Sequence, residues 1–138
     1  PNHFHFLLHQ KSIDSIDRFM NSIGTRYTMY FNKKYKRVGF LYQGVYKAVL
    51  VSADEQLLHL SRYIHKQALA LQGQALVRGM QEQPSSYLDY LGKRKTEWVH
   101  PEEILKFFSK TNHKFSYEAF VKQEEDFTTI NKLTLEEI

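Results

Sequence analysis

Tyr63 and Gln67 have the residue types and the spacing for covalent catalysis beside a metal ion. Side chains four residues apart on a helix lie one turn apart and point the same way. A phenol hydroxyl can attack a substrate group, while an amide oxygen can help to hold a metal against the same group. A half-buried tyrosine at the edge of an amphipathic helix shows the same pattern, so this pair alone does not establish a site.

His3 and His5, near the start of the chain, have the spacing of a two-point metal clamp. The segment 1–9 alternates in the period of a strand, which predicts that His3, His5 and His9 share one face while Phe4 packs inward. Imidazoles are good ligands for a divalent ion, and a regular backbone would fix the distance between them. An exposed strand face that happens to carry histidines is the alternative interpretation.

The helix that carries Tyr63 is predicted to begin at Ser52, because Ser52 and Glu55 have the spacing of a capping box. Its apolar face consists of Leu57, Leu60, Ile64, Ala68 and Leu71, and a polar stripe beside it consists of Gln56, His59, Tyr63 and Gln67. His59 and His65 are either further polar groups of the site or exposed helix residues. His65 lies two positions from Tyr63 and points elsewhere, which favours an exposed residue.

The other elements follow from periodicity and from turn residues. A helix is predicted from Ser12 to about Asn32, and the β-branched run 45–51 predicts a buried strand. Beyond Pro84 the sequence predicts three short helices, at 86–91, 102–109 and 116–123, followed by a loosely ordered acidic tail. Domain boundaries are predicted at 1–80 for a catalytic domain and 81–138 for a helical extension with the tail.

Basic and aromatic residues alternate where the first predicted helix ends. Cationic groups neutralise phosphates and aromatic rings stack on unpaired bases, a combination typical of single-stranded nucleic-acid binding. A solvated helix end with cations that favour the helix dipole is the alternative. The candidate contacts are Arg26, Tyr30, Lys33, Lys34, Tyr35, Arg37 and Lys47.

Composition limits the classes of function. The 138 residues suit one globular protein with a net charge of +4 and no cysteine, so any metal must be held by histidine, carboxylate or amide groups. Residues 1–96 contain 14 Lys and Arg against 6 Asp and Glu, whereas residues 97–138 contain 5 against 9. This asymmetry favours a polyanionic partner for the basic part. No apolar run approaches the length of a membrane span or a signal peptide.

Five stretches of the chain, in this order, resemble the single-tyrosine HUH transposases, the insertion-sequence-200-like proteins that include the REP-associated tyrosine transposases. The stretches are 1–8, with its histidine–hydrophobic–histidine motif, 26–32, 39–44, 61–65 and 85–92. The resemblance implies a ferredoxin-like (RRM-like) α+β sandwich, in which helices cover one face of an antiparallel sheet.

The resemblance also implies the chemistry of the site. In this family Tyr63 would attack a scissile phosphodiester of single-stranded DNA and form a 5′-phosphotyrosine link with a free 3′-hydroxyl. A divalent ion, Mg²⁺ or Mn²⁺, would be held by His3, His5 and Gln67 and would polarise the phosphate. A phenol is a poor nucleophile near neutral pH, so the phosphate charge must be offset for the attack to proceed.

The chain departs from the family pattern at two places. Relatives usually continue the Tyr-Ile-His motif with Leu-Asn-Pro, whereas this chain has Lys66, Gln67 and Ala68. Gln67 keeps an amide ligand at the same position, and the loss of the proline predicts that the helix continues toward Gly73. Val45 replaces a common arginine, which removes one expected phosphate contact.

The family's fold has a strand, a helix and another strand before its histidine motif, and this sequence opens at that motif. A sheet built only from the strands predicted at 3–10 and 45–51 would have two strands, which is marginal. We therefore infer that the sequence is a fragment or that another copy of the chain supplies partner strands in a homodimer.

The sequence thus predicts a metal-dependent transposase that cuts and rejoins single-stranded DNA, with a hairpin as the expected DNA form. The setting implied is the bacterial cytoplasm, in association with the nucleoid and with no membrane partner. Two other interpretations stay open: a domesticated or inactive nucleic-acid-binding protein of the same fold, and a two-histidine metal-dependent hydrolase in which Tyr63 only positions the substrate.

Overall fold

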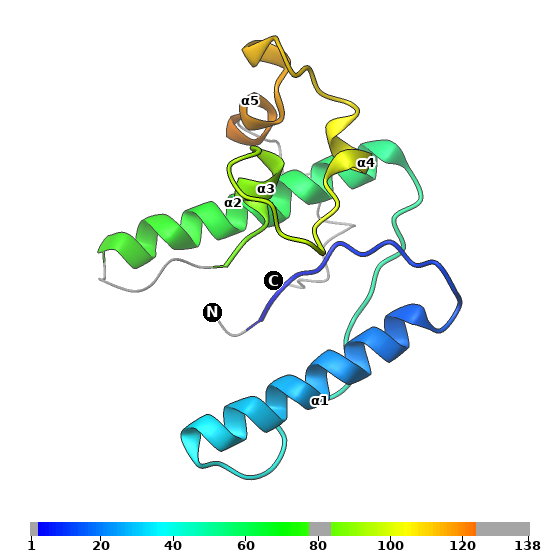
Figure 1. Cartoon of the computed structure of the whole chain (residues 1–138), viewed down its shortest axis with the longest axis vertical. Coiled ribbons are helices and arrows are strands. Elements are labelled where there is room, and N and C mark those ends of the chain that lie inside the picture. Colours follow the sequence, from blue (N-terminus) through cyan, green and yellow to red (C-terminus); the bar gives the residue numbers. More distant parts are fainter. Residues whose placement is uncertain (1–2, 78–83, 124–138) are drawn as a thin grey trace. The chain divides into compact units, whose positions relative to one another are not determined.

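The computed structural model describes residues 3–77 and 84–123, and it shows helices joined by irregular segments (Figure 1). The chain divides into two compact units, Pro1–Ala48 and Val49–Ile138, and each unit is described by itself. The predicted boundary near residue 80 falls within the second unit, and the domain assignment stays a prediction. The predicted acidic tail from residue 124 onward lies outside the described residues.

The predicted ferredoxin-like α+β sandwich is wrong, because residues 3–77 and 84–123 contain no β-strand. The segments predicted as strands, 3–10 and 45–51, are irregular, and Val45 and Leu50 are 85% and 86% exposed. Alternation and β-branched residues indicate only a local preference, and a strand forms when a second strand satisfies its backbone groups. No such ladder is present in the described ranges.

The first unit is built on helix α1, Ser15–Tyr35. It begins and ends three residues later than the sequence predicted. Its first turn is closed by Ser15, whose backbone N–H and hydroxyl both donate to the Ser12 carbonyl at 3.1 and 2.8 Å. The helix ends at Lys36, which adopts the left-handed conformation (φ 52°) and donates its backbone N–H to the Asn32 carbonyl.

Aromatic rings from the flanking segments cover part of α1. The Phe6 ring contacts the Phe19 ring with centroids 5.6 Å apart, and Tyr42 contacts Tyr27 at 6.4 Å. The Tyr46 hydroxyl donates to the Asp17 carboxylate. None of the described residues of this unit is buried. The apolar stripe of α1, which was predicted to pack on a sheet, is therefore only partly covered in this part of the chain.

The second unit is built on helix α2, Asp54–Val77. The helix runs beyond Gly73, which confirms the extension predicted from the missing proline. Another contact replaces the predicted capping box: Ser52 lies two residues before the first helical residue, Asp54, and its N–H donates to the side-chain oxygen of Gln56 at 3.1 Å instead of to Glu55. Within the described ranges, no helix combines the length and the apolar character needed to cross a membrane.

Short helices complete this unit (Figure 1). They are α3, Tyr87–Tyr90; α4, Glu102–Leu105; the 3₁₀ helix η1, His113–Phe115; and α5, Tyr117–Lys122. Of these, α5 packs on α2, and η1 packs on α5. Three of them confirm the predicted helices in shorter form, and η1 was not predicted. The buried apolar side chains are Tyr87, Ile104, Tyr117 and Val121. The hydrophobic core therefore lies between α2 and the segment 84–123.

The most buried described side chains of α2 are polar. Ser61, Arg62 and His65 are at most 5% exposed, whereas Leu57 and Ile64, on the predicted apolar face, are only half-buried. The prediction that His65 is exposed is wrong, because its ring nitrogens lie 2.8 Å from the Tyr117 hydroxyl and 2.9 Å from the Ser86 hydroxyl. These partners come from distant parts of the chain, so helical spacing could not reveal them.

An ion pair closes the loop that follows α3. Arg94 donates from Nε to the Asp89 carboxylate at 2.8 Å, and the backbone N–H of Thr96 donates to the same carboxylate at 2.7 Å. The hydrogen bond from Arg94 lowers the pKa of Asp89 to about 2. Arg94 belongs to the basic group 93–95, so at least one cation of that group stabilises the fold through an ion pair.

Burial of His65 predicts that the protein loses stability in mild acid. Burial lowers the pKa of His65 from 6.5 to about 4. The unfolded chain therefore binds a proton between these values that the folded protein does not, so the free energy of unfolding falls as pH decreases from 6.5 to 4. A shift of this size corresponds to about 3 kcal/mol.

Urea unfolding followed by circular dichroism at pH 7.5, 6.5, 5.5 and 4.5 measures this loss. His65→Gln, which cannot titrate, should flatten the pH dependence, whereas His100→Gln at an exposed position should leave it unchanged. Equal pH dependence in the unmodified protein and in His65→Gln would contradict the assignment.

Candidate active site and nucleic-acid interface

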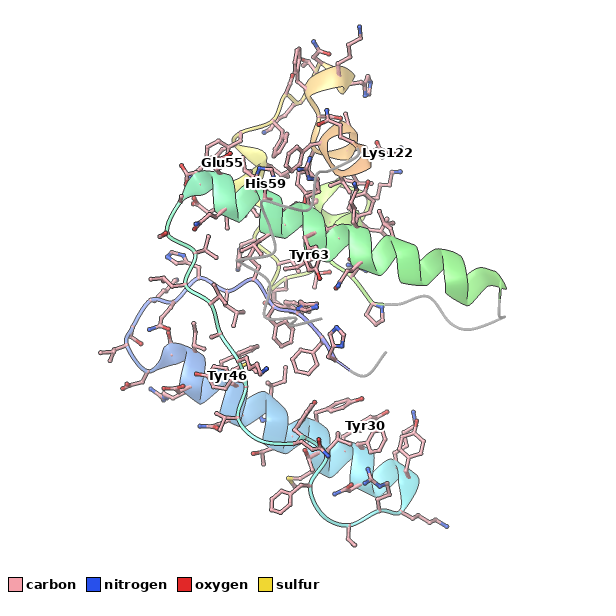
Figure 2. The ribbon with its side chains drawn as sticks, turned by 180° about the vertical axis from the view of Figure 1, so that it is seen from behind. Tyr30, Tyr46, Glu55, His59, Tyr63 and Lys122 are labelled. Carbon is pink, nitrogen blue, oxygen red and sulfur yellow. The ribbon has the colours of Figure 1, made fainter. Side chains whose placement is uncertain are left out.

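Tyr63 and Gln67 contact each other on α2. The Gln67 side-chain nitrogen donates a hydrogen bond to the Tyr63 hydroxyl at 2.7 Å, and both side chains are half-buried. Figure 2 shows Tyr63 near the middle of α2, one turn after His59. The spacing of four residues therefore brings the phenol and the amide together, as the sequence indicated.

The direction of this hydrogen bond suits a phenol that changes charge. An N–H donor to the phenol oxygen stabilises negative charge there, both when the oxygen loses its proton and when it leaves a phosphate ester. The Gln67 nitrogen makes this bond, so the Gln67 side-chain oxygen does not take part in it. An amide oxygen is the atom that can ligate a hard cation.

His59, the neighbour of Tyr63 in the predicted polar stripe, interacts with other residues. Its Nδ1 lies 3.0 Å from Nη2 of Arg62, and its Nε2 lies 3.9 Å from the Glu55 carboxylate. The Arg62 guanidinium stacks on the Phe120 ring at 4.2 Å from its centroid. A buried cation thus lies one position before Tyr63, which the sequence analysis missed because Phe120 is 58 residues away.

His3 and His5 belong to the first unit. Their ring centroids lie 5.1 Å apart with the planes at 78°. With metal–nitrogen bonds of about 2.1 Å, two imidazoles that share one ion place their centroids roughly 4.5–5.5 Å apart, so the observed spacing fits a shared ion. The two side chains come together although the predicted strand does not form.

The four predicted catalytic and metal-binding residues fall in different units. His3 and His5 precede residue 48, whereas Tyr63 and Gln67 follow it. Each pair is close by itself, and the assembly of all four into one site stays a prediction. The part of the chain that the structure describes contains no group of three or more histidine or carboxylate side chains that could hold a metal.

Cations and aromatic rings gather at the end of α1. Nζ of Lys34 lies 5.7 Å from the centroid of Tyr30 and 5.4 Å from that of Tyr35, and these rings are 57% and 53% exposed. A hydrogen bond to Tyr30 raises the pKa of Lys34. Lys33 joins Tyr30 and Lys34 around a hollow of about 410 Å³. We call these four residues, with Arg37, the α1 cluster; Figure 2 labels Tyr30.

The remaining predicted nucleic-acid contacts lie outside the α1 cluster. Arg26 borders a second hollow of about 450 Å³ together with Phe19, Ser22, Ile23 and Tyr27. Lys47 is exposed on the irregular segment that precedes α2. Within the α1 cluster, Arg37 holds its guanidinium 5.6 Å from the Phe31 centroid. The structure therefore gathers five of the seven predicted contacts at the end of α1.

A comparison with family models supports one class of protein. The model described as Transposase IS200 like matches residues 1–67, a range that contains His3, His5, Tyr63, Gln67 and the whole α1 cluster. The match covers just under half of the 138 residues. It supports an assignment to the IS200-like transposases and confirms the resemblance drawn from the motifs. Comparisons with curated proteins and with solved structures return no match.

Proposed function

We propose that the protein cuts and rejoins single-stranded DNA with Tyr63 as the nucleophile. The observation that carries this proposal is the 2.7 Å hydrogen bond from Gln67 to the Tyr63 hydroxyl, within the range that matches the transposase family. An N–H donor one turn from the nucleophile oxygen can hold that oxygen in place and stabilise the negative charge that it gains on losing its proton.

The proposed step is an exchange of phosphate esters. The Tyr63 oxygen bonds to the scissile phosphorus, and the bond between phosphorus and the 3′ oxygen breaks. The proton that the phenol loses is balanced by the proton that the 3′ oxygen gains, so the products are a 5′-phosphotyrosine link and a free 3′-hydroxyl. One ester replaces another, and rejoining by the reverse step needs no nucleotide cofactor.

A divalent ion, Mg²⁺ or Mn²⁺, fits the donor set of His3, His5 and Gln67. When bound, it would supply positive charge that draws electron density from the phosphate. The two imidazoles would provide fixed nitrogen ligands at the spacing described above, and the Gln67 oxygen would provide the third. The Gln67 nitrogen would meanwhile hold the phenol oxygen in place.

The DNA strand is proposed to run along the α1 cluster. Exposed Tyr30 and Tyr35 offer ring faces to unpaired bases, and Lys33, Lys34 and Arg37 offer positive charge to phosphates. Arg26 and Lys47 extend the basic surface of the same unit. This pairing of charge and rings favours a single strand over a duplex, whose bases are stacked away from such rings.

Tyr63→Phe should abolish the covalent adduct and leave DNA affinity within about twofold, because only the attacking oxygen is lost. The substrate is single-stranded DNA from both flanks of the gene, labelled at the 3′ end, since the label must stay on the strand that carries the 5′-phosphotyrosine. The adduct is measured on a denaturing gel. Tyr90→Phe serves as the matched control, and an adduct formed by Tyr63→Phe would show that another residue attacks.

Replacement of a histidine ligand should raise the divalent ion concentration needed for cleavage. His3→Ala or His5→Ala should weaken Mn²⁺ binding by at least roughly tenfold, since even residues that only support a ligand have effects of that size. Gln67→Ala should have a smaller effect because a neutral amide is a weaker ligand. Calorimetric Mn²⁺ titration and adduct assays measure both quantities, with His100→Ala as control. Full activity of the unmodified protein in chelator would exclude the metal.

Removing single cations near the α1 cluster should weaken DNA binding through charge alone. Substitution of Arg26, Lys33, Lys34, Arg37 or Lys47 by Ala should lower the slope of log K against log salt by about 0.7, the value for one phosphate on a single strand. Tyr30→Leu or Tyr35→Leu should cost on the order of 1–3 kcal/mol of binding and leave the slope unchanged.

The control for these charge variants is Lys110→Ala, an exposed cation of the second unit. Binding to a labelled single strand over a salt series supplies the slopes, and thermal melts detect unfolding. If all five cation variants keep the unmodified slope, the strand runs elsewhere on the protein.

A further inference from the structure

The hydroxyl of Tyr117 on α5 joins two residues of α2 that flank Tyr63 in sequence. It donates to Oγ of Ser61 at 3.1 Å and lies 2.8 Å from Nδ1 of His65. Tyr117 is 3% exposed, and its two partners are 2% and 3% exposed. Hydrogen bonds in such an environment are not weakened by competition with water.

One assignment of protons satisfies this whole group of hydrogen bonds. The Ser61 hydroxyl donates to the Leu58 carbonyl at 2.8 Å and accepts from Tyr117. With that proton committed, Nδ1 of His65 donates to the Tyr117 oxygen. Nε2 of His65 then accepts from the Ser86 hydroxyl at 2.9 Å. Neutral His65 therefore has a partner for each nitrogen, from α5 on one side and from the residue before α3 on the other.

Aromatic rings enclose the imidazole as well. The His65 ring meets the Tyr90 ring edge-on with centroids 4.7 Å apart and lies 5.4 Å from the Tyr87 ring. Segment 84–123 thus contacts His65 through both hydrogen bonds and ring packing, and any rotation of α2 about its axis would break both.

Further contacts hold α2 on the same side. Arg62 stacks on Phe120 and donates to its carbonyl at 3.4 Å, and the Lys66 ammonium donates to the Gln123 carbonyl. The α2 positions that contact the segment 84–123 in this way are therefore 61, 62, 65 and 66. At about 100° per residue, Tyr63 lies roughly 130° and Gln67 roughly 170° around the helix from the centre of these four positions, so both lie largely on the other side of the helix.

We propose that Tyr117 and His65 are positioning residues for Tyr63: the segment 84–123 fixes the rotation of α2 through them and so sets where the Tyr63 hydroxyl points. This inference rests on the proposed role of Tyr63 as nucleophile. It assigns a task to a part of the chain that lies beyond the family match of 1–67. Directional hydrogen bonds are suited to this task, because half-buried apolar side chains can slide without a large loss of contact.

Tyr117→Phe tests the proposal, because it keeps the ring and removes the oxygen that joins Ser61 to His65. We expect the rate of adduct formation at saturating DNA to fall by roughly tenfold, as for a small displacement of a reacting group. The DNA concentration for half-maximal rate should not change, since Tyr117 is buried away from solvent. Tyr90→Phe, in the same cluster but without a hydrogen bond to α2 among the described residues, should keep the unmodified rate.

The assay uses the full chain, the 3′-labelled single-stranded DNA defined above, and a temperature below the onset of unfolding for every variant. Ser61→Ala removes only the bond between Tyr117 and Ser61, one of the two that Tyr117→Phe removes, so it should lower the rate by a smaller factor. The double variant should be no slower than Tyr117→Phe alone, because Tyr117→Phe already removes the bond to Ser61. Ser61→Ala decides the matter if Tyr117→Phe does not fold.

The two proposals fail in different ways. Absence of an adduct with the unmodified protein overturns the role of Tyr63 and this inference together. An unmodified rate in folded Tyr117→Phe or Ser61→Ala, or an equal loss of rate in Tyr90→Phe, overturns the positioning role alone. A changed half-maximal DNA concentration with an unchanged maximal rate also overturns it.

Discussion

The second unit depends on keeping an imidazole neutral and fully hydrogen-bonded in its interior. His65 is satisfied by hydroxyls from two segments that lie 21 and 52 residues further along the chain. A buried polar group without partners costs about 1–3 kcal/mol, so the helix α2 and the segment 84–123 are favoured only in the arrangement that supplies both partners. Apolar burial contributes through Tyr87, Ile104, Tyr117 and Val121, but it does not select one rotation of α2.

The first unit is organised differently. Its helix α1 has no buried residue, and rings from the flanking segments meet it edge-on or tilted. Five of the seven predicted nucleic-acid contacts gather at its C-terminal end, where the helix dipole favours cations. The helix dipole is therefore one reason for basic residues at this position, and binding of a polyanion is another. The match to a transposase family favours binding of a polyanion.

The match to the IS200-like transposases covers residues 1–67, whereas the best-packed part of the described chain is formed by α2 with residues beyond that range. The catalytic helix belongs to both parts. One face carries Tyr63 and its partner Gln67, and another face carries Ser61, Arg62 and His65, which bind the C-terminal segment. One helix therefore connects the proposed chemistry to the fold that holds it.

The sequence by itself determined the local features. Helical spacing predicted that Tyr63 and Gln67 meet, the missing proline predicted the length of α2, and the motifs predicted the family. These depend on residues within a turn or two of each other, where backbone geometry leaves little choice. Only the tertiary structure decided that His65 is buried, that Arg62 stacks on Phe120, and that residues 3–10 and 45–51 form no strand in the described chain. Each of these depends on whether a distant segment supplies a hydroxyl, a ring or a ladder of backbone groups, and local pattern contains no information about such a partner.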